Sequence, residues 1–175
     1  MRRPYLPVRA LALLLLPFLS AVPGCRQTGP AVEFVEGVIS LDGEPIADAT
    51  VGFSPAGGSG PTAFGKTDDK GVFHLTTVQG GRPQGGAPVG EYIVTVKKWR
   101  NRLAELGPRP DPSDAAFAAW SRREQELLAM PPDYIVPVDY GEKRTSGLKT
   151  TVVRGRNTGP AFTFALSSDF KAKPE

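Results

Sequence analysis

Residues 37–53, GVISLDGEPIADATVGF, constrain the fold of this chain more than any other stretch. Ile39 and Leu41 occupy alternate positions, as in a strand that buries one face. The pair Asp42-Gly43 favours a tight turn, because Gly accepts positive φ and Asp can hydrogen-bond to its own backbone. Alternation resumes at the end of the stretch, so we expect a strand, a turn and a strand that form the first hairpin of a small β-sandwich.

The same alternation recurs along the chain and predicts an all-β, antiparallel sandwich of seven short strands. In the clearest strand, Tyr92, Val94 and Val96 are expected to face the core. Residues 55–61 and 78–89 are rich in Gly and Pro without periodicity, which predicts open loops. The domain is expected at residues 32–167, with strands at 33–41, 50–54, 62–67, 72–77, 90–98, 148–153 and 161–166 and further β-structure at 133–138.

Residues 99–132 interrupt the β pattern between the fifth and sixth strands. A helix is expected over residues 114–130, with Ser113 as its N-cap and with apolar residues at helical spacing. In one interpretation its apolar face covers the sandwich. In the other, Trp99, Phe117 and Trp120 form a surface that contacts a partner, since clustered exposed aromatic side chains usually mark contacts.

Residues 1–24 are typical of a secretory signal peptide. Three Arg precede the apolar run ALALLLLPFL, which is shorter than the roughly 20 residues that span a bilayer. The following motif Val22-Pro23-Gly24-Cys25 resembles the lipobox of bacterial lipoproteins, and this resemblance implies that Cys25 carries a diacylglycerol. The alternative is an ordinary signal peptide that leaves an unpaired Cys. Residues 25–31 are expected to tether the domain to the membrane, and residues 168–175 to form a polar tail.

The positive charge of the chain belongs largely to the signal peptide. The chain has 21 basic and 18 acidic residues and a net charge of +3. Three Arg and no acidic residue precede Cys25, so the rest of the chain carries 18 residues of each sign. This balance gives no support to nucleic-acid binding, which requires a basic patch on the folded domain. Cys25 is the only Cys, so an acylated protein has no thiol for a disulfide or a thiolate metal site.

Several segments together resemble the carboxypeptidase regulatory-like domain, a transthyretin-like sandwich of seven strands. The similarity covers residues 35–98 well, and residues 136–166 are similar to the ending of small secreted lipoproteins common in planctomycete bacteria. The resemblance implies a fold and an accessory or adhesion-like role, with no shared catalytic residues. The residues that carry it are VEGVI at 35–39, DGEPI at 42–46, ATV at 49–51, Phe53, Thr67-Asp68, GVF at 71–73, Leu75, GEYIVTV at 90–96, Pro137, Tyr140, TSGL at 145–148 and FTF at 162–164.

No residue pattern points to catalysis, a cofactor or a metal centre. His74 is the only His and is expected on an exposed strand face, with no second His for a zinc site or a triad. Asp68-Asp69 supplies too few ligands for Ca²⁺ and favours a turn. Residues 60–67 match the string GxxxxGK[ST], but a turn and not a helix follows, so no nucleotide site is expected.

These observations favour a non-enzymatic, lipid-anchored module on the extracytoplasmic side of a membrane, either periplasmic or at the cell surface. It would bind or scaffold another macromolecule of the cell envelope. The alternative is a carrier or binder of a small molecule or glycan through loops 55–61 and 78–89, since loops at one end of a sandwich commonly form such sites. An enzyme would need paired acidic residues in a cleft, which the sequence does not locate.

Overall fold

The computed structural model describes residues 29–172. The expected signal peptide at 1–24 and the lipidated Cys25 lie outside the described residues. Within the described part, no helix is long and apolar enough to cross a bilayer.

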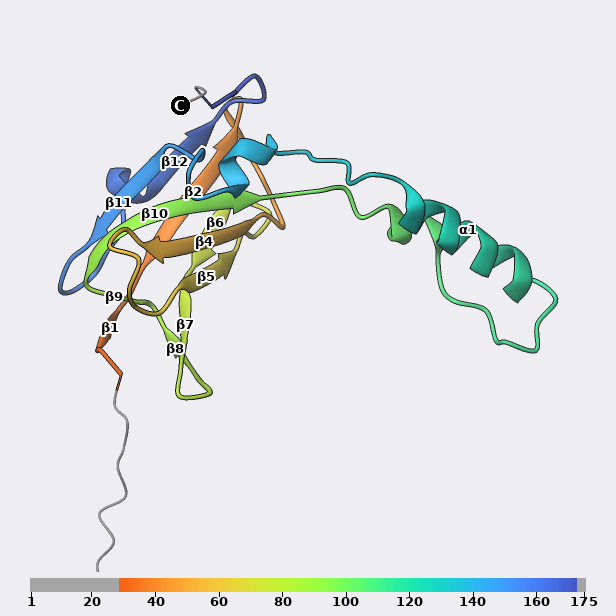
Figure 1. The fold of residues 1–175 in the computed structure, drawn as a ribbon, viewed down its shortest axis with the longest axis horizontal. Coiled ribbons are helices and arrows are strands. Elements are labelled where there is room, and N and C mark those ends of the chain that lie inside the picture. Colours follow the sequence, from red (N-terminus) through yellow and green to blue (C-terminus); the bar gives the residue numbers. More distant parts are fainter. Residues whose placement is uncertain (1–28, 173–175) are drawn as a thin grey trace, which may run out of the picture.

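The chain folds into a mostly β structure with antiparallel sheets and one α-helix, as the sequence predicts (Figure 1). Residues 29–172 contain twelve strands, and three of these, at 44–45, 82–85 and 87–88, lie outside the seven predicted ones. The largest sheet has the order β11 (Leu148–Val152), β10 (Gly90–Lys97), β4 (Thr50–Pro55), β5 (Ala63–Lys66), β7 (Thr76–Gln79), β8 (Arg82–Gly85). A second sheet contains β12 (Thr163–Leu166), β2 (Glu36–Leu41), β3 (Glu44–Pro45) and, paired with β2, β6 (Val72–His74); a third pairs β1 (Val32–Glu33) with β9 (Ala87–Pro88).

The turn predicted at Asp42-Gly43 is confirmed, but the expected hairpin around it is wrong in its second strand. Both residues have positive φ, 52° and 91°, as a two-residue hairpin turn of type I′ requires. The turn joins β2 to the two-residue strand β3. The chain then crosses to the other sheet, where β4 pairs with β5 and β10.

Residues 78–89 do not form the open loop that the sequence predicts. They complete β7 and form β8 and β9, with Gly80 and Gly81 at positive φ in the turn between β7 and β8. The segment predicted as one strand at 72–77 also divides at Leu75. Its first half, β6, pairs with β2, and its second half, β7, pairs with β5, so the chain changes sheets within six residues.

The hydrophobic core contains side chains from both larger sheets. Phe53 of β4 lies at its centre and contacts Phe73, Tyr92, Phe162 and Phe164, with ring centroids 5.8–6.4 Å away. The predicted inward set of β10 is confirmed, because Tyr92, Val94 and Val96 are buried. Such alternation is what a strand with one covered face produces.

The C-terminal strands depart from the expected antiparallel arrangement. β12 follows the short 3₁₀ helix η3 (Pro160–Phe162) and pairs with β2 in parallel, whereas β11 pairs with β10. These two strands therefore belong to different sheets. The β-structure predicted at 133–138 is reduced to one bridge between Trp99 and Tyr134, followed by the 3₁₀ helix η2 (Val138–Gly141).

Residues 99–135, which we call the arm, project away from the sheets (Figure 1). The arm contains the 3₁₀ helix η1 (Arg102–Leu106) and the α-helix α1 (Phe117–Ala129). α1 begins later than expected, with Ala116 at its N-cap position and no side-chain cap hydrogen bond. Ser113, the predicted N-cap, instead donates its backbone N–H to the Asp111 carboxylate. α1 packs against η1 and does not cover either sheet, so the first interpretation of the insert is wrong.

Candidate functional site

The arm leaves the β-domain through two antiparallel segments, residues 98–102 and 131–136, which we call the neck. Backbone hydrogen bonds connect them: Arg100 N–H donates to the Asp133 carbonyl at 2.8 Å, and Ile135 and Val136 N–H donate to the Lys98 carbonyl. The neck is therefore a short ladder that continues the direction of β10, and the arm has a defined attachment to the domain.

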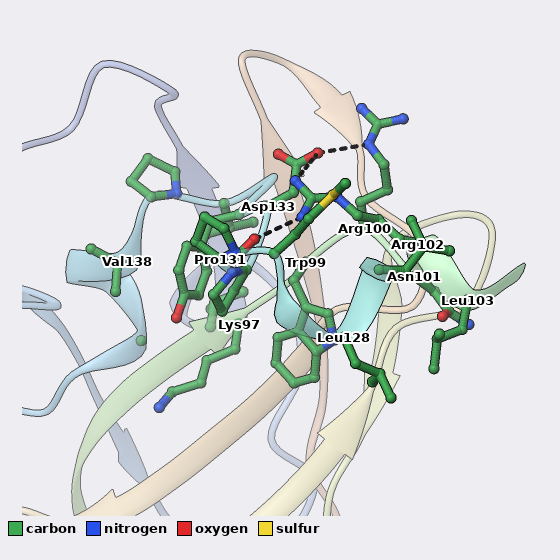
Figure 2. Close-up of a pocket in the computed structure, with 18 of the residues that line it drawn as sticks. Lys97, Trp99, Arg100, Asn101, Arg102, Leu103, Leu128, Pro131, Asp133 and Val138 are labelled. Atoms are coloured by element: carbon green, nitrogen blue, oxygen red, sulfur yellow. Dashed lines mark hydrogen bonds and ion pairs between the residues drawn. The ribbon is translucent and has the colours of Figure 1, made fainter. Parts of the chain in front are cut away.

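A cluster of charged side chains also stabilises the neck. The Asp133 carboxylate lies 3.0 Å from the Arg100 Nε and 3.6 Å from the Arg102 guanidinium (Figure 2). Arg102 also donates to the Pro131 carbonyl at 2.7 Å. One carboxylate thus holds two arginines, and Arg102 joins the start of η1 to the residues that follow α1.

A pocket of about 540 Å³ lies at the neck, between the last turn of α1 and the end of β10 (Figure 2). We call it the neck pocket. Leu127 is buried beside it, while Trp99 and Leu128 are 52% and 63% exposed. Its apolar lining comprises Val96, Trp99, Leu103, Leu127, Leu128, Met130, Pro131, Pro132, Tyr134, Val136, Pro137 and Val138.

The exposed apolar side chains of the described residues concentrate around this pocket. Twelve large hydrophobic residues are exposed in residues 29–172, and seven of them lie between Trp99 and Val138. Isolated exposed apolar residues are ordinary, but a contiguous group marks a contact surface. The volume is in the range of about 300–1,000 Å³ usual for small-molecule sites.

The structure does not bring the three predicted contact residues together. Trp99 lines the neck pocket, near the C-terminal end of α1. Phe117 is the first residue of α1, about 15 Å along the helix axis from Leu127 at 1.5 Å per residue. Phe117 and Trp120 lie beneath the Arg109 guanidinium, whose carbon is 5.3 Å and 5.7 Å from their ring centroids.

Sequence reasoning missed most of the pocket. Leu103, Met130, Tyr134 and Val138 carry no motif, and they come from both sides of the arm. The available signal was the number of apolar residues in an insert that is otherwise rich in charge and Pro. Neither loop 55–61 nor residues 78–89 contributes to the neck pocket or to the two cavities beside it.

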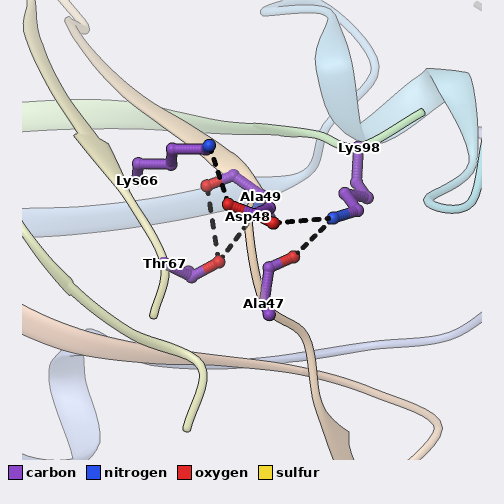
Figure 3. Close-up of polar contacts among 6 residues, drawn as sticks. All are labelled: Ala47, Asp48, Ala49, Lys66, Thr67 and Lys98. Carbon is purple, nitrogen blue, oxygen red and sulfur yellow. Dashed lines mark hydrogen bonds and ion pairs between the residues drawn. The ribbon is translucent and has the colours of Figure 1, made fainter. Parts of the chain in front are cut away.

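A second polar cluster lies on the β-domain next to the neck. The Asp48 carboxylate lies 2.7 Å from the Lys66 ammonium and 3.9 Å from that of Lys98, which also donates to the Ala47 carbonyl (Figure 3). Lys66 lowers the pKa of Asp48 below its ordinary value, with a smaller contribution from Lys98. Thr67 accepts a hydrogen bond from the Ala49 N–H at 2.8 Å and so fixes this corner.

The remaining candidates have structural explanations. Asp68 accepts hydrogen bonds from the backbone N–H groups of Lys70 and Val72, which confirms the predicted turn. His74 is exposed, as expected, and lies 2.9 Å from the Glu36 carboxylate. β5 runs through the GxxxxGK[ST] string and no helix follows it. Among residues 29–172, no three His, Cys, Asp or Glu side chains are placed to hold a metal ion.

Comparison with known proteins gives no relative for this chain. No protein-family model, no curated protein and no solved structure matches it. The functional argument therefore depends on the sequence and on the geometry of the neck, the arm and the adjoining sheet face.

Proposed function

We propose that this protein is a non-enzymatic, lipid-anchored module of the cell envelope whose arm binds another macromolecule. The fold we propose is a transthyretin-like β-sandwich related to carboxypeptidase regulatory-like domains, with the arm as its distinguishing addition. The observation that carries this proposal is the projecting arm with exposed apolar side chains gathered at its base. A helix that buries one residue, Leu127, gains little from its own domain.

The relative position of the two ends of β10 supports an arm that faces away from the membrane. β1, which follows the expected tether, pairs with β9 immediately before β10 begins, and the arm leaves where β10 ends (Figure 1). An eight-residue strand is about 26 Å long at 3.3 Å per residue. A lipid on Cys25 would hold the β1 end at the bilayer and present the arm to a partner on the extracytoplasmic side.

The partner surface is tested by crosslinking the protein in intact cells and comparing variants of the neck pocket. Leu128→Glu and Trp99→Ala should each abolish a discrete crosslinked product that the wild type forms. Gln125→Glu adds the same charge to an exposed position on α1 outside the pocket and should leave that product unchanged. Equal crosslinking by all four proteins would overturn the proposed role of the arm.

A second candidate function is the binding of a small apolar molecule, which the size and apolar lining of the neck pocket favour. In this second function the neck pocket is the binding site, in place of the loops 55–61 and 78–89 that the sequence suggests. Mass spectrometry of lipid and small-molecule extracts from the purified protein separates the two functions. A stoichiometric ligand that Leu128→Glu removes would favour the carrier.

A further inference from the structure

A groove runs over the outer face of the largest sheet, beside the neck. It consists of two cavities of about 520 and 650 Å³ that share Thr50 and Lys97. β4 and β10 form its floor, β5 forms one side, and residues 141–145 form the other. We call it the sheet-face groove. It is open along its length, which suits an extended chain better than a compact ligand.

Gly52 lets the side chains of β5 and β10 close over β4 at the centre of the groove. A Cβ atom at this position would lie 2.8 Å from the Thr95 Oγ1 and 3.7 Å from the Phe64 ring, so there is no room for a side chain here and Thr95 and Phe64 form the floor. Phe64 pairs directly with Gly52 across β4 and β5 and remains 54% exposed. An aromatic side chain beside a glycine therefore offers an apolar surface to whatever lies in the groove.

Hydroxyl groups line the same surface. Thr50, Ser54, Thr62, Thr95 and Thr145 border the larger cavity. Thr95 and Thr145 already donate to the Gly52 and Asp139 carbonyls, and Ser54 is buried. Thr50 and Thr62 remain to donate and accept hydrogen bonds with the hydroxyls of a sugar ring.

Basic residues are concentrated in the groove, although residues 29–172 as a whole are not basic. Four of the 21 basic residues precede residue 29 and Lys173 follows the described part, which leaves 16 basic residues against 17 acidic ones in residues 29–172. Six of these 16 line the groove, against two acidic residues. The basic residues are Lys66, Lys97, Lys98, Arg100, Lys143 and Arg144, and the acidic ones are Asp48 and Glu142.

Ion pairs within the domain neutralise only part of this charge. Asp48 pairs with Lys66 and Lys98, Glu142 pairs with Lys97, and Asp133 of the neck pairs with Arg100, so four of the six basic residues already have an ion-pair partner. Lys143 and Arg144 are exposed and form no ion pair within residues 29–172. They are available for the anionic groups of a ligand, and charge-assisted hydrogen bonds are the stronger class.

We propose that the sheet-face groove binds an acidic polysaccharide. Carboxylates of such a polymer match Lys143 and Arg144, its hydroxyls match Thr50 and Thr62, and the apolar face of a sugar ring matches Phe64. An acidic peptide fits less well, because the groove lacks the deep apolar pocket in which protein interfaces bury their anchors. The proposal goes beyond the function of the arm, because the residues that carry it, Lys143, Arg144 and Phe64, line the larger cavity, which contains no arm residue. The smaller cavity also includes Trp99, Arg100, Asn101 and Ile135 at the base of the arm.

The test measures binding of the full-length protein in detergent to polygalacturonate at low ionic strength, by affinity electrophoresis. We expect the double variant Lys143→Gln/Arg144→Gln to weaken binding at least tenfold. Lys70→Gln/Arg82→Gln removes the same charge from exposed positions outside the groove and should bind like the wild type.

Two uncharged changes separate a shaped site from general attraction between opposite charges. Gly52→Val displaces Thr95 and Phe64 from the floor, and Phe64→Ala removes the exposed ring; each should weaken polygalacturonate binding without changing net charge. Because Phe64 is exposed, Phe64→Ala keeps the test decisive if Gly52→Val unfolds. Unchanged binding by a folded variant, equally tight binding of poly-glutamate or polyphosphate, or no binding of polygalacturonate would each overturn the proposal.

Discussion

At the scale of single residues, Phe53 shows how local sequence produces the core. It is fully buried and packs against four aromatic rings, three from the two larger sheets and Phe162 from η3. Phe53→Ala should lower the free energy of unfolding by about 3–5 kcal/mol, because it removes a large side chain and leaves a cavity. Urea unfolding measures this loss, and Phe53→Leu should lose less. A loss below about 1 kcal/mol for Phe53→Ala would contradict a single core shared by both sheets.

Asp48 gives a prediction on pH at the same scale. Its pKa is lowered, first by the hydrogen bond from Lys66 and then by the charges of Lys66 and Lys98. A group whose pKa is lower in the folded state stabilises the fold above its unfolded pKa of about 3.9, and this contribution disappears as pH falls through the folded value. Lys66→Gln should therefore raise the Asp48 pKa in an NMR titration and weaken the pH dependence of stability below about pH 4. Lys70→Gln, a nearby charge change outside the cluster, should leave the Asp48 pKa unaltered.

At the scale of elements, the neck is the base of the arm and attaches it to the β-domain. Arg100 and Asp133 are joined by a backbone hydrogen bond and an ion pair, so their chain ends are close enough for a tight turn. Replacing residues 101–132 by a four-residue Gly-rich turn should leave a cooperatively folded β-domain, because α1 contributes little to the core. Far-UV circular dichroism should lose its helical component and keep its β component. Loss of a cooperative thermal transition would show that the domain depends on the arm.

At the scale of the whole molecule, membrane attachment and folding are expected to depend on different parts of the chain. In the function that we propose, the lipid on Cys25 attaches the protein to the membrane; no helix in residues 29–172 is long and apolar enough to cross a bilayer. Cys25→Ser should therefore move the protein from the membrane fraction to a soluble extracytoplasmic fraction while leaving its circular dichroism unchanged. Metabolic labelling with a palmitate analogue should mark the wild type and not the variant. A labelled variant, or one that stays with the membrane, would contradict the lipoprotein assignment.

Sequence patterns predicted the inward residues well because side-chain alternation is a local property. Ile39 and Val94 are expected on the buried faces of their strands from alternation alone, and both are fully buried. Leu41, expected on the same face as Ile39, is only partly buried. The Gly80-Gly81 turn was also readable, since paired glycines favour a two-residue hairpin. As strand breakers alone, these two glycines predict an open loop at 78–89, and that prediction is wrong.

The candidate site was less predictable than the core. Trp99 was identified from its residue type, but the pocket around it needs two segments about thirty residues apart, which meet only at the neck. The sheet-face groove has the same origin, because Gly52, Phe64 and Lys143 belong to three different parts of the chain. The local periodicity of apolar residues carries no information about contacts between segments that are so far apart in the sequence.

The sequence by itself determined most of the inward residues of the strands, the tight turn at Asp42-Gly43, and that an insert follows the fifth predicted strand. The tertiary structure alone decided that β2 and β4 lie in different sheets, that β12 runs parallel to β2, and that α1 stands away from the domain. The physical reason is that alternation records which face of a strand is apolar, whereas pairing depends on the geometry of the connections. A strand with one apolar face can satisfy its backbone hydrogen bonds with several neighbours, and an amphipathic helix can bury its apolar side against a domain or present it to a partner.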